Sequence, residues 1–252
     1  MNYKILVIAH KKAKFPSDPI YLPMEVGAFN HKEHFLEYRD DKGDNISNKN
    51  PNYCELTGLY EAYKNMEYDV LGLVHYRRYF LKSNFAFKKD FKNIIDQKTI
   101  DKLLKKYDII LPKKRHYYIE SNYSHYIHAH NKEALDKTIE IIKNDYPDYY
   151  PYLMKHLKKT TGHYFNMFIA KKEVIDPYLK WMFDILFKVE HEIDLTKYEG
   201  VEARVFGYVS ELLIDVYVNK NNLKVKNQKY LFWEKQNWVK KIFNFIKRKI
   251  NH

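Results

Sequence analysis

A chain of 252 residues in which 45% are hydrophobic and 30% are charged has the composition of an ordinary globular protein, which excludes a disordered or a membrane-embedded chain. Cys54 is the only cysteine, so neither an intramolecular disulfide nor a cysteine-based zinc site can form. The formal net charge of +12 is compatible with nucleic acid, an anionic membrane surface or phosphorylated substrates as partners. No apolar run is long enough to cross a bilayer and the N-terminal stretch lacks the features of a signal peptide, so we expect a cytoplasmic protein.

The first third of the chain predicts the start of a sheet, followed by a long excursion. Residues 3–9 form an apolar run typical of a buried parallel strand. Residues 11–51 have few apolar repeats and many Pro, Gly, Asp and Asn residues, so we expect a mostly irregular segment. The Asn-Pro pair at 50–51 and the apolar spacing after it predict a helix that ends near Asn65. Residues 70–80 begin as a buried strand and end in a polar, basic turn.

The remainder of the chain alternates helical and strand patterns. We predict helices over residues 98–106, 131–143, 177–190 and 201–219, and strands over residues 107–112 and 163–170. Such alternation predicts an open α/β sheet with helices on both faces.

The C-terminal residues 231–252 are predicted to be a basic appendage to a domain formed by residues 1–230. They contain six basic residues and one acidic residue, so +5 of the total charge of +12 is concentrated there. Residues 238–250 place apolar and basic side chains on opposite faces of an amphipathic helix. Two interpretations stay open: the helix binds the anionic inner face of the cell membrane, or it packs on the domain with a solvated basic face.

The turn after the strand at 70–75 is the first candidate for a functional site. Ligands of open α/β sheets bind beyond the carboxyl ends of strands, and His75, Arg77 and Arg78 stand at such an end. Two adjacent guanidinium groups there are suited to a diphosphate, whose charge grows as it departs from a sugar. The alternative is a basic surface turn paired with local acids.

A second group of candidates lies between the first two predicted strands. Asp44, Asn45 and Ser47 offer short polar side chains on a glycine-hinged loop, suited to a base or a ribose, although such residues also cap turns. Glu55 and Thr57 lie on the helix that follows, where the helix dipole favours an early carboxylate without any function.

The second half of the chain adds histidine, amide and carboxylate candidates. Tyr126 and His128 belong to a histidine-rich run that resembles metal ligands on a strand, but no acid falls inside the run. Hydrogen bonding to a sugar or a phosphate, and a structural role, are the alternatives to metal binding. His163 and Asn166 bracket a predicted strand, and Glu211 is either a satisfied buried carboxylate or a base with a raised pKa.

Several ordered motifs together resemble a bacterial family that has been catalogued as a domain of unknown function and is associated with capsule, exopolysaccharide and O-antigen assembly. The motifs are GDNIS, YCELTGLY, HYRRYF, SHYIHAH, GHYFNMFIAKKE and RVFGYVSELL, and the similarity extends from the first strand to about Tyr217. Some members are classed as glycosyltransferases, including ones that transfer galactofuranose. The resemblance therefore implies a GT-A-like, Rossmann-type sheet that moves a sugar from a nucleotide sugar, such as UDP-galactofuranose, to a growing or lipid-linked glycan.

The resemblance also implies roles for individual residues. Donor binding falls to Asp44, Asn45, Ser47, Glu55, Thr57, Arg77 and Arg78, and acceptor binding to His163, Asn166, Tyr126 and His128. Catalysis falls to His75, the two arginines and, if the reaction inverts the anomeric configuration, Glu211 as general base. GT-A enzymes hold a divalent metal with an Asp-x-Asp at a strand end, whereas here that strand ends in His75-Tyr76-Arg77-Arg78. We therefore expect arginine in place of metal and no cofactor.

Two functions of other classes compete with a transferase. A nucleic-acid-binding module would interleave lysines and aromatic rings along one element, but the basic excess is concentrated in the tail, so we expect no nucleic acid partner. A noncatalytic scaffold, attached to a membrane through the tail, is the other alternative.

Overall fold

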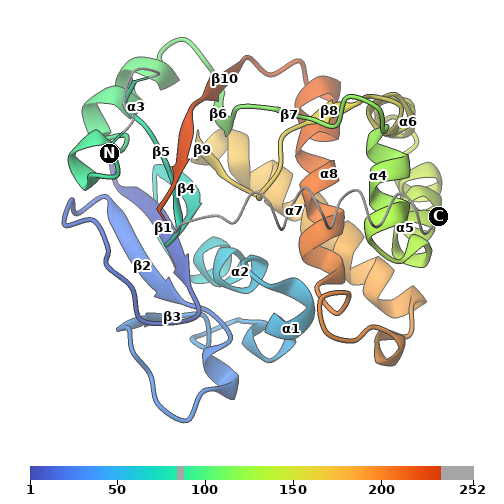
Figure 1. Ribbon diagram of the computed structural model, residues 1–252, viewed down its shortest axis with the longest axis horizontal. Helices are drawn as coiled ribbons and strands as arrows, with labels where there is room; N and C mark the ends of the chain where they lie inside the picture. Colours follow the sequence, from blue (N-terminus) through green and yellow to red (C-terminus); the bar gives the residue numbers. More distant parts are fainter. Residues whose placement is uncertain (84–87, 234–252) are drawn as a thin grey trace.

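A computed structural model describes residues 1–83 and 88–233 of the chain, and its centre is a nine-stranded sheet (Figure 1). The strand order is β10-β6-β9-β4-β1-β2-β3, and β5 joins β4 to β11 beside this path. The strands of this sheet are β1 (Tyr3–Ala9), β2 (Tyr21–Glu25), β3 (Tyr38–Arg39), β4 (Val70–His75), β5 (Arg78–Phe80), β6 (Ile109–Pro112), β9 (Phe168–Lys171), β10 (Val225–Gln228) and β11 (Tyr230–Phe232). A separate antiparallel pair joins β7 (Arg115–His116) to β8 (Thr161–Gly162).

The sheet is mixed, and its direction decides where the site lies. β1, β2, β3 and β4 run parallel, while β9 is antiparallel to both β4 and β6. Since β4 and β6 therefore point the same way, their carboxyl ends meet at one edge of the sheet. The predicted strands at 3–9, 70–75 and 107–112 are confirmed as β1, β4 and β6.

Helices cover both faces of the sheet, as predicted (Figure 1). The helices are α1 (Asn50–Tyr53), α2 (Leu56–Asn65), α3 (Gln97–Leu104), α4 (Asn122–Ala129), α5 (Lys132–Asp145), α6 (Tyr150–Leu157), α7 (Lys172–Glu192) and α8 (Val205–Lys220). Successive residues of β1 alternate between two cores: Leu6 packs on the side of α2, α7 and α8, and Val7 on the side of α3. The sequence-based expectation of an open α/β sheet is confirmed.

The predicted helix from 50 to 65 is broken, which corrects the sequence analysis. Cys54 has a left-handed backbone conformation with φ 53° and divides the segment into α1 and α2. Gly58 then lets α2 approach the sheet, because a Cβ atom there would lie 2.8 Å from the side chain of Ile8. This close packing fixes Glu55, just before α2, near the carboxyl edge of β4.

The excursion over residues 11–51 is more ordered than its composition predicts. It contains β2, which pairs with β1 although it includes Pro23. β3 pairs with Met24 and Glu25 but not with Pro23. The N–H group that Pro23 lacks is therefore not needed as a donor to β3.

The predicted strand at 163–170 and the strand-like interpretation of the histidine-rich run are also corrected. Residues 163–167 form a loop, with Phe165 at φ 78° and Asn166 at φ 52°, and only the last part of the predicted segment is strand β9. The histidine-rich run forms helix α4 rather than a strand, so its side chains do not alternate across a sheet.

The C-terminal part of the described chain belongs to the body of the fold. Tyr230 pairs with Phe80, and the Trp233 N–H donates to the carbonyl oxygen of Arg77, so the boundary expected after residue 230 falls within β11. The amphipathic helix expected at 238–250 lies outside the described residues. Within the described ranges, none of the helices combines the length and apolarity needed to span a bilayer.

Candidate active site

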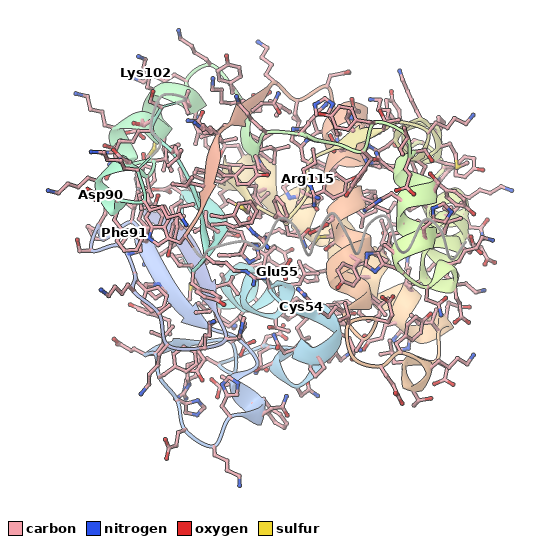
Figure 2. The ribbon with its side chains drawn as sticks, in the orientation of Figure 1. Cys54, Glu55, Asp90, Phe91, Lys102 and Arg115 are labelled. Atoms are coloured by element: carbon pink, nitrogen blue, oxygen red, sulfur yellow. The ribbon has the colours of Figure 1, made fainter. Side chains whose placement is uncertain are left out.

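A cavity of about 240 Å³ opens at the edge of the sheet where β4 and β6 end. Its walls come from both ends of the sequence, which explains why no single motif describes it. The cavity is lined by Glu55, His75, Arg77, Arg78, Arg115, Tyr117, Asn122, His125, Tyr126, His130, Tyr164, Phe165, Arg204, Tyr208, Glu211 and Leu212. Figure 2 shows Arg115 above Glu55 and Cys54 in the middle of the molecule.

Arg78 reaches the cavity because the chain reverses immediately after β4. His75 and Arg78 are paired in register, so Tyr76 and Arg77 form a two-residue turn. The guanidinium carbon of Arg78 lies 4.1 Å from the ring centre of Phe165, which is a cation–π distance. The Arg78 Nε atom is buried without a hydrogen-bond partner in the described structure, and such a donor is costly unless a ligand fills it.

Four arginines share the cavity, and none has a carboxylate within ion-pair distance in the described residues. They are Arg77, Arg78, Arg115 and Arg204. By contrast, Arg39, which lies outside the cavity, pairs with Asp41 at 3.0 Å. Burial lowers the pKa of Arg78 to about 10, with a further contribution from the nearby Arg77 charge, so Arg78 stays cationic at neutral pH. The four arginines outnumber the two carboxylates of the cavity, Glu55 and Glu211, so the site has an excess of positive charge that suits a polyanionic ligand.

Two carboxylates lie beside these arginines in different environments. Glu55 Oε1 accepts a hydrogen bond from Asn166 Nδ2 at 2.8 Å, and Glu211 Oε1 accepts one from the Phe165 N–H at 2.9 Å. Burial, together with the negative charge of Glu55, raises the pKa of Glu211 to about 7. A carboxyl group that titrates near neutral pH beside a charged partner is a candidate proton acceptor.

The turn at 164–166 connects the charged groups of the cavity. The Phe165 N–H binds Glu211, its carbonyl oxygen accepts from His75 Nε2 at 2.8 Å, and its ring covers Arg78. Asn166 also donates to the carbonyl oxygen of Gly207 at 3.1 Å, which ties the turn to α8. Two consecutive non-glycine residues with positive φ are strained, and strain of this kind concentrates at functional sites.

His75 is held as a neutral imidazole. Burial and the positive charge of Arg78 lower the pKa of His75 to about 4. Because the contact to the carbonyl oxygen of Phe165 requires a donor, Nε2 carries the proton and Nδ1 is left as an acceptor. His75 therefore does not add to the positive charge of the cavity.

The other end of the cavity is aromatic. The rings of Tyr117 and His125 stack with centres 3.6 Å apart, and those of His130 and Tyr208 stack with centres 3.7 Å apart. Tyr126 packs edge-to-face against His130, with ring centres 5.2 Å apart. Flat, partly polar walls of this kind suit a sugar ring, which offers apolar C–H faces and polar edges.

Several predicted donor-binding residues have structural contacts outside the cavity. Ser47 and Thr57 are buried, and both hydroxyl groups donate to the buried carboxylate of Asp40. Asp44 pairs with Lys64 at 3.0 Å on the surface. Asn45 accepts from the Ser47 N–H and donates to the carbonyl oxygen of Gly43, which is a local turn. Of the predicted donor residues, the cavity contains Glu55, Arg77 and Arg78.

The predicted acceptor residues are also divided. Tyr126 lines the cavity, and Asn166 stands behind it, bonded to Glu55. His128 lies on the outside of α4, where its Nδ1 atom is 2.9 Å from Glu120. His163 is buried between Asp215, at 2.8 Å, and Asn227, at 2.6 Å.

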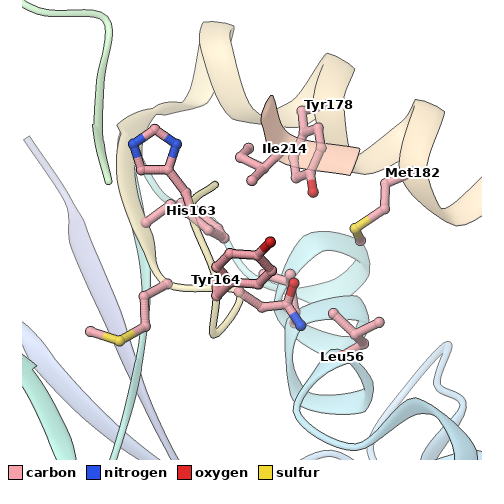
Figure 3. Close-up of a pocket in the computed structure, with 10 residues that line it drawn as sticks. Leu56, His163, Tyr164, Tyr178, Met182 and Ile214 are labelled. Atoms are coloured by element: carbon pink, nitrogen blue, oxygen red, sulfur yellow. The ribbon is translucent and has the colours of Figure 1, made fainter. Parts of the chain in front are cut away.

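The space next to His163 is too small for a sugar. Figure 3 shows this enclosed pocket between α2, α7 and α8, with Tyr178, Met182 and Leu56 on its walls. Its volume is about 10 Å³, which is near the minimum for one water molecule. In this structure His163 connects Asp215 of α8 with Asn227 of β10.

The cavity also contains residues that sequence reasoning missed. Arg115 follows β6. Ligands bind beyond the carboxyl ends of strands, so the predicted strand at 107–112 would have indicated Arg115 as a site residue. Arg204, at the N-terminal end of α8, and Tyr208 precede the predicted Glu211 at helical spacing, so they share its face of an otherwise apolar helix. Phe165 gave no signal, because its role depends on a left-handed backbone conformation.

The sheet, the helices on both faces and the cavity at the strand edge define a GT-A-like α/β fold. The chain belongs to the family described as "Domain of unknown function (DUF4422)", whose model matches residues 4–222, and this confirms the family resemblance. It is similar to the apo structure of the WbbM bifunctional glycosyltransferase, with a TM-score of 0.84 and 32% sequence identity. The match covers 93% of this chain and 46% of the WbbM chain, so the chain spans less than half of that protein. Comparison with curated proteins gave no match.

Proposed function

We propose that the protein is a glycosyltransferase that moves a sugar from a nucleoside diphosphate sugar to a hydroxyl group of a glycan. The observation that carries this proposal is the placement of four arginines without carboxylate partners beside Glu211 in one cavity of the described structure. The similarity to WbbM, which is a glycosyltransferase by name, supports the same reaction class.

In the proposed reaction, an acceptor oxygen attacks the anomeric carbon of the donor sugar. Glu211, in its ionised form, takes the proton from that hydroxyl group as the new C–O bond forms. The bond between the anomeric carbon and the diphosphate oxygen breaks, and the electron pair leaves with the nucleoside diphosphate. Arg78 and its neighbouring arginines stabilise the charge that develops on this leaving group.

We propose that the arginines perform the task that a divalent metal performs in many GT-A enzymes. β4 ends at His75, where Tyr76, Arg77 and Arg78 follow instead of an Asp-x-Asp motif. No cluster of three His, Cys, Asp or Glu side chains suited to a metal ion is found among residues 1–83 and 88–233. Guanidinium groups match phosphate oxygens in geometry and charge, so they are a chemically adequate substitute.

The identities of the substrates follow from the family resemblance. A UDP sugar, with UDP-galactofuranose as one example, is our proposed donor. We propose that the aromatic end, with Tyr126 and the stacked pairs Tyr117/His125 and His130/Tyr208, holds a growing capsular, exopolysaccharide or lipid-linked glycan. We propose a peripheral location at the inner face of the cell membrane, where a lipid-linked acceptor would be accessible.

A thermal-shift panel of nucleotides and nucleotide sugars tests this proposal. A ligand that binds only the folded protein raises its Tm, so the correct nucleoside diphosphate should raise it without added metal. A transfer assay with the best donor and a panel of glycan acceptors then tests the reaction. A folded protein whose Tm does not change with any nucleotide sugar would reject the proposal of a transferase.

A further inference from the structure

The loop that enters the cavity also carries an unusual outer surface. Arg115 and Tyr117 line the cavity, and side chains of an extended segment alternate in direction. Lys114, His116 and Tyr118 therefore belong to the opposite side, and the ring centres of His116 and Tyr118 lie 6.0 Å apart.

The tip of this loop exposes two large apolar side chains. Tyr118 is 84% exposed and Ile119 is 66% exposed. Tyr118 has φ 59°, and the Ile119 N–H donates to the carbonyl oxygen of Tyr117, so the tip is a tight, strained turn. Packing within the chain does not explain two adjacent, exposed apolar side chains. Such side chains are suited to shallow insertion into a partner surface.

Lysines surround this tip. Lys113 and Lys114 are exposed just before it, and Lys158 and Lys159 follow α6. The Tyr117 N–H donates to the carbonyl oxygen of Thr160 at 2.9 Å, which holds the two segments together. None of the four lysines has an ion-pair partner within the described ranges, and the nearest acid along the loop, Glu120, is buried against two histidines.

We infer that residues 113–119 and 158–159 form a docking surface for an anionic lipid bilayer. The unpaired lysines bind lipid phosphates, and Tyr118 and Ile119 insert among the headgroups. Docking here brings the lipid surface next to the loop that carries Arg115 and Tyr117 into the cavity. This inference goes beyond the proposed reaction and is independent of it, since membrane binding is measured without donor or acceptor.

The test is flotation of the full chain with vesicles of phosphatidylcholine, with and without phosphatidylglycerol. The variant K113Q/K114Q should bind the anionic vesicles roughly tenfold to thirtyfold more weakly than the parent. The matched control K102Q/K105Q removes two exposed lysines on and next to α3, where Figure 2 shows Lys102 far from Arg115. It loses the same charge and should stay within about twofold of the parent.

The apolar tip is tested separately with Y118N/I119S. Asn tolerates the left-handed conformation at 118, and all lysines remain. This variant should bind anionic vesicles roughly fivefold to tenfold more weakly, with the difference persisting at high salt.

Three outcomes would overturn the docking surface. One is an equal loss in K113Q/K114Q and K102Q/K105Q, which would mean that total charge governs binding. Another is full binding by both K113Q/K114Q and Y118N/I119S, which would assign binding to other residues. The third is loss of single-stranded RNA binding by K113Q/K114Q with unchanged vesicle binding, which would make the surface a nucleic-acid site. Unchanged Tm values would show that the variants are folded.

Discussion

Asn166 donates a hydrogen bond to Glu55 at 2.8 Å, and this contact distinguishes the two carboxylates of the cavity. Glu211 instead accepts from the backbone N–H of Phe165 at 2.9 Å. Desolvation of the half-buried Glu211, together with the negative charge of Glu55, raises the pKa of Glu211 to about 7. Glu211 is therefore placed to exchange a proton near neutral pH.

Turnover should depend on pH through Glu211. A general base must be ionised, so kcat/KM should rise with pH and level off above about 7. The variant Glu211→Gln cannot take up the proton and should lose about two orders of magnitude in kcat while binding the donor normally. Initial rates across a pH series measure both effects, and near-normal turnover by Glu211→Gln would remove its role.

Glu55 should set the position of this pH limb. Glu55→Gln removes the negative charge that helps to raise the pKa of Glu211, so the limb should move to lower pH. Glu173→Gln is a matched control, because Glu173 is exposed and does not line the cavity. A limb that stays in place in Glu55→Gln would contradict the coupling.

The raised pKa of Glu211 also predicts an effect on stability. Its folded pKa, about 7, exceeds the ordinary value of 4.5, so the folded protein favours the protonated form. The associated stabilisation is complete at acidic pH and is lost as pH rises through about 7. Glu211→Gln should therefore raise the free energy of unfolding at pH 8 by about 1–2 kcal/mol and change it little at pH 5. Denaturant unfolding at both pH values measures this difference; an equal effect at both would contradict it.

The arginines should determine donor affinity. Arg78→Lys and Arg115→Lys keep a positive charge but lose the planar fork, so each should weaken UDP binding by roughly tenfold to a hundredfold. Arg39→Lys is the control, since Arg39 already pairs with Asp41 outside the cavity. Titration calorimetry gives the Kd values. Equal affinities in all three variants would show that Arg78 and Arg115 do not bind the donor.

The sequence predicted those parts of the fold and site that depend on local patterns. Buried runs identified β1, β4 and β6, and the position of His75 and Arg78 at a strand end identified one side of the cavity. Ser47 and Thr57 lie outside the cavity, and both hydroxyl groups donate to the buried carboxylate of Asp40. A contact of that kind depends on tertiary packing and leaves no sequence pattern.

Other parts of the site depend on backbone conformations that sequence does not reveal. Cys54 breaks a helix that its neighbours favour, and Phe165 adopts a left-handed conformation that is rare for a bulky residue. Both are held by contacts made far along the chain, such as that between Arg204 Nε and Cys54 Sγ at 3.1 Å. These contacts aim Glu55 and Glu211 into one cavity, and they exist only after the fold has formed.

A crystal structure of the protein with UDP, grown in the presence of EDTA, would show whether arginines hold the diphosphate without metal. We expect diphosphate oxygens within hydrogen-bond distance of the Arg78 guanidinium group, including its unpartnered Nε atom, with Arg115 nearby and no metal bound. Diphosphate bound at another edge of the sheet, or bound only after manganese replaces EDTA, would contradict this expectation.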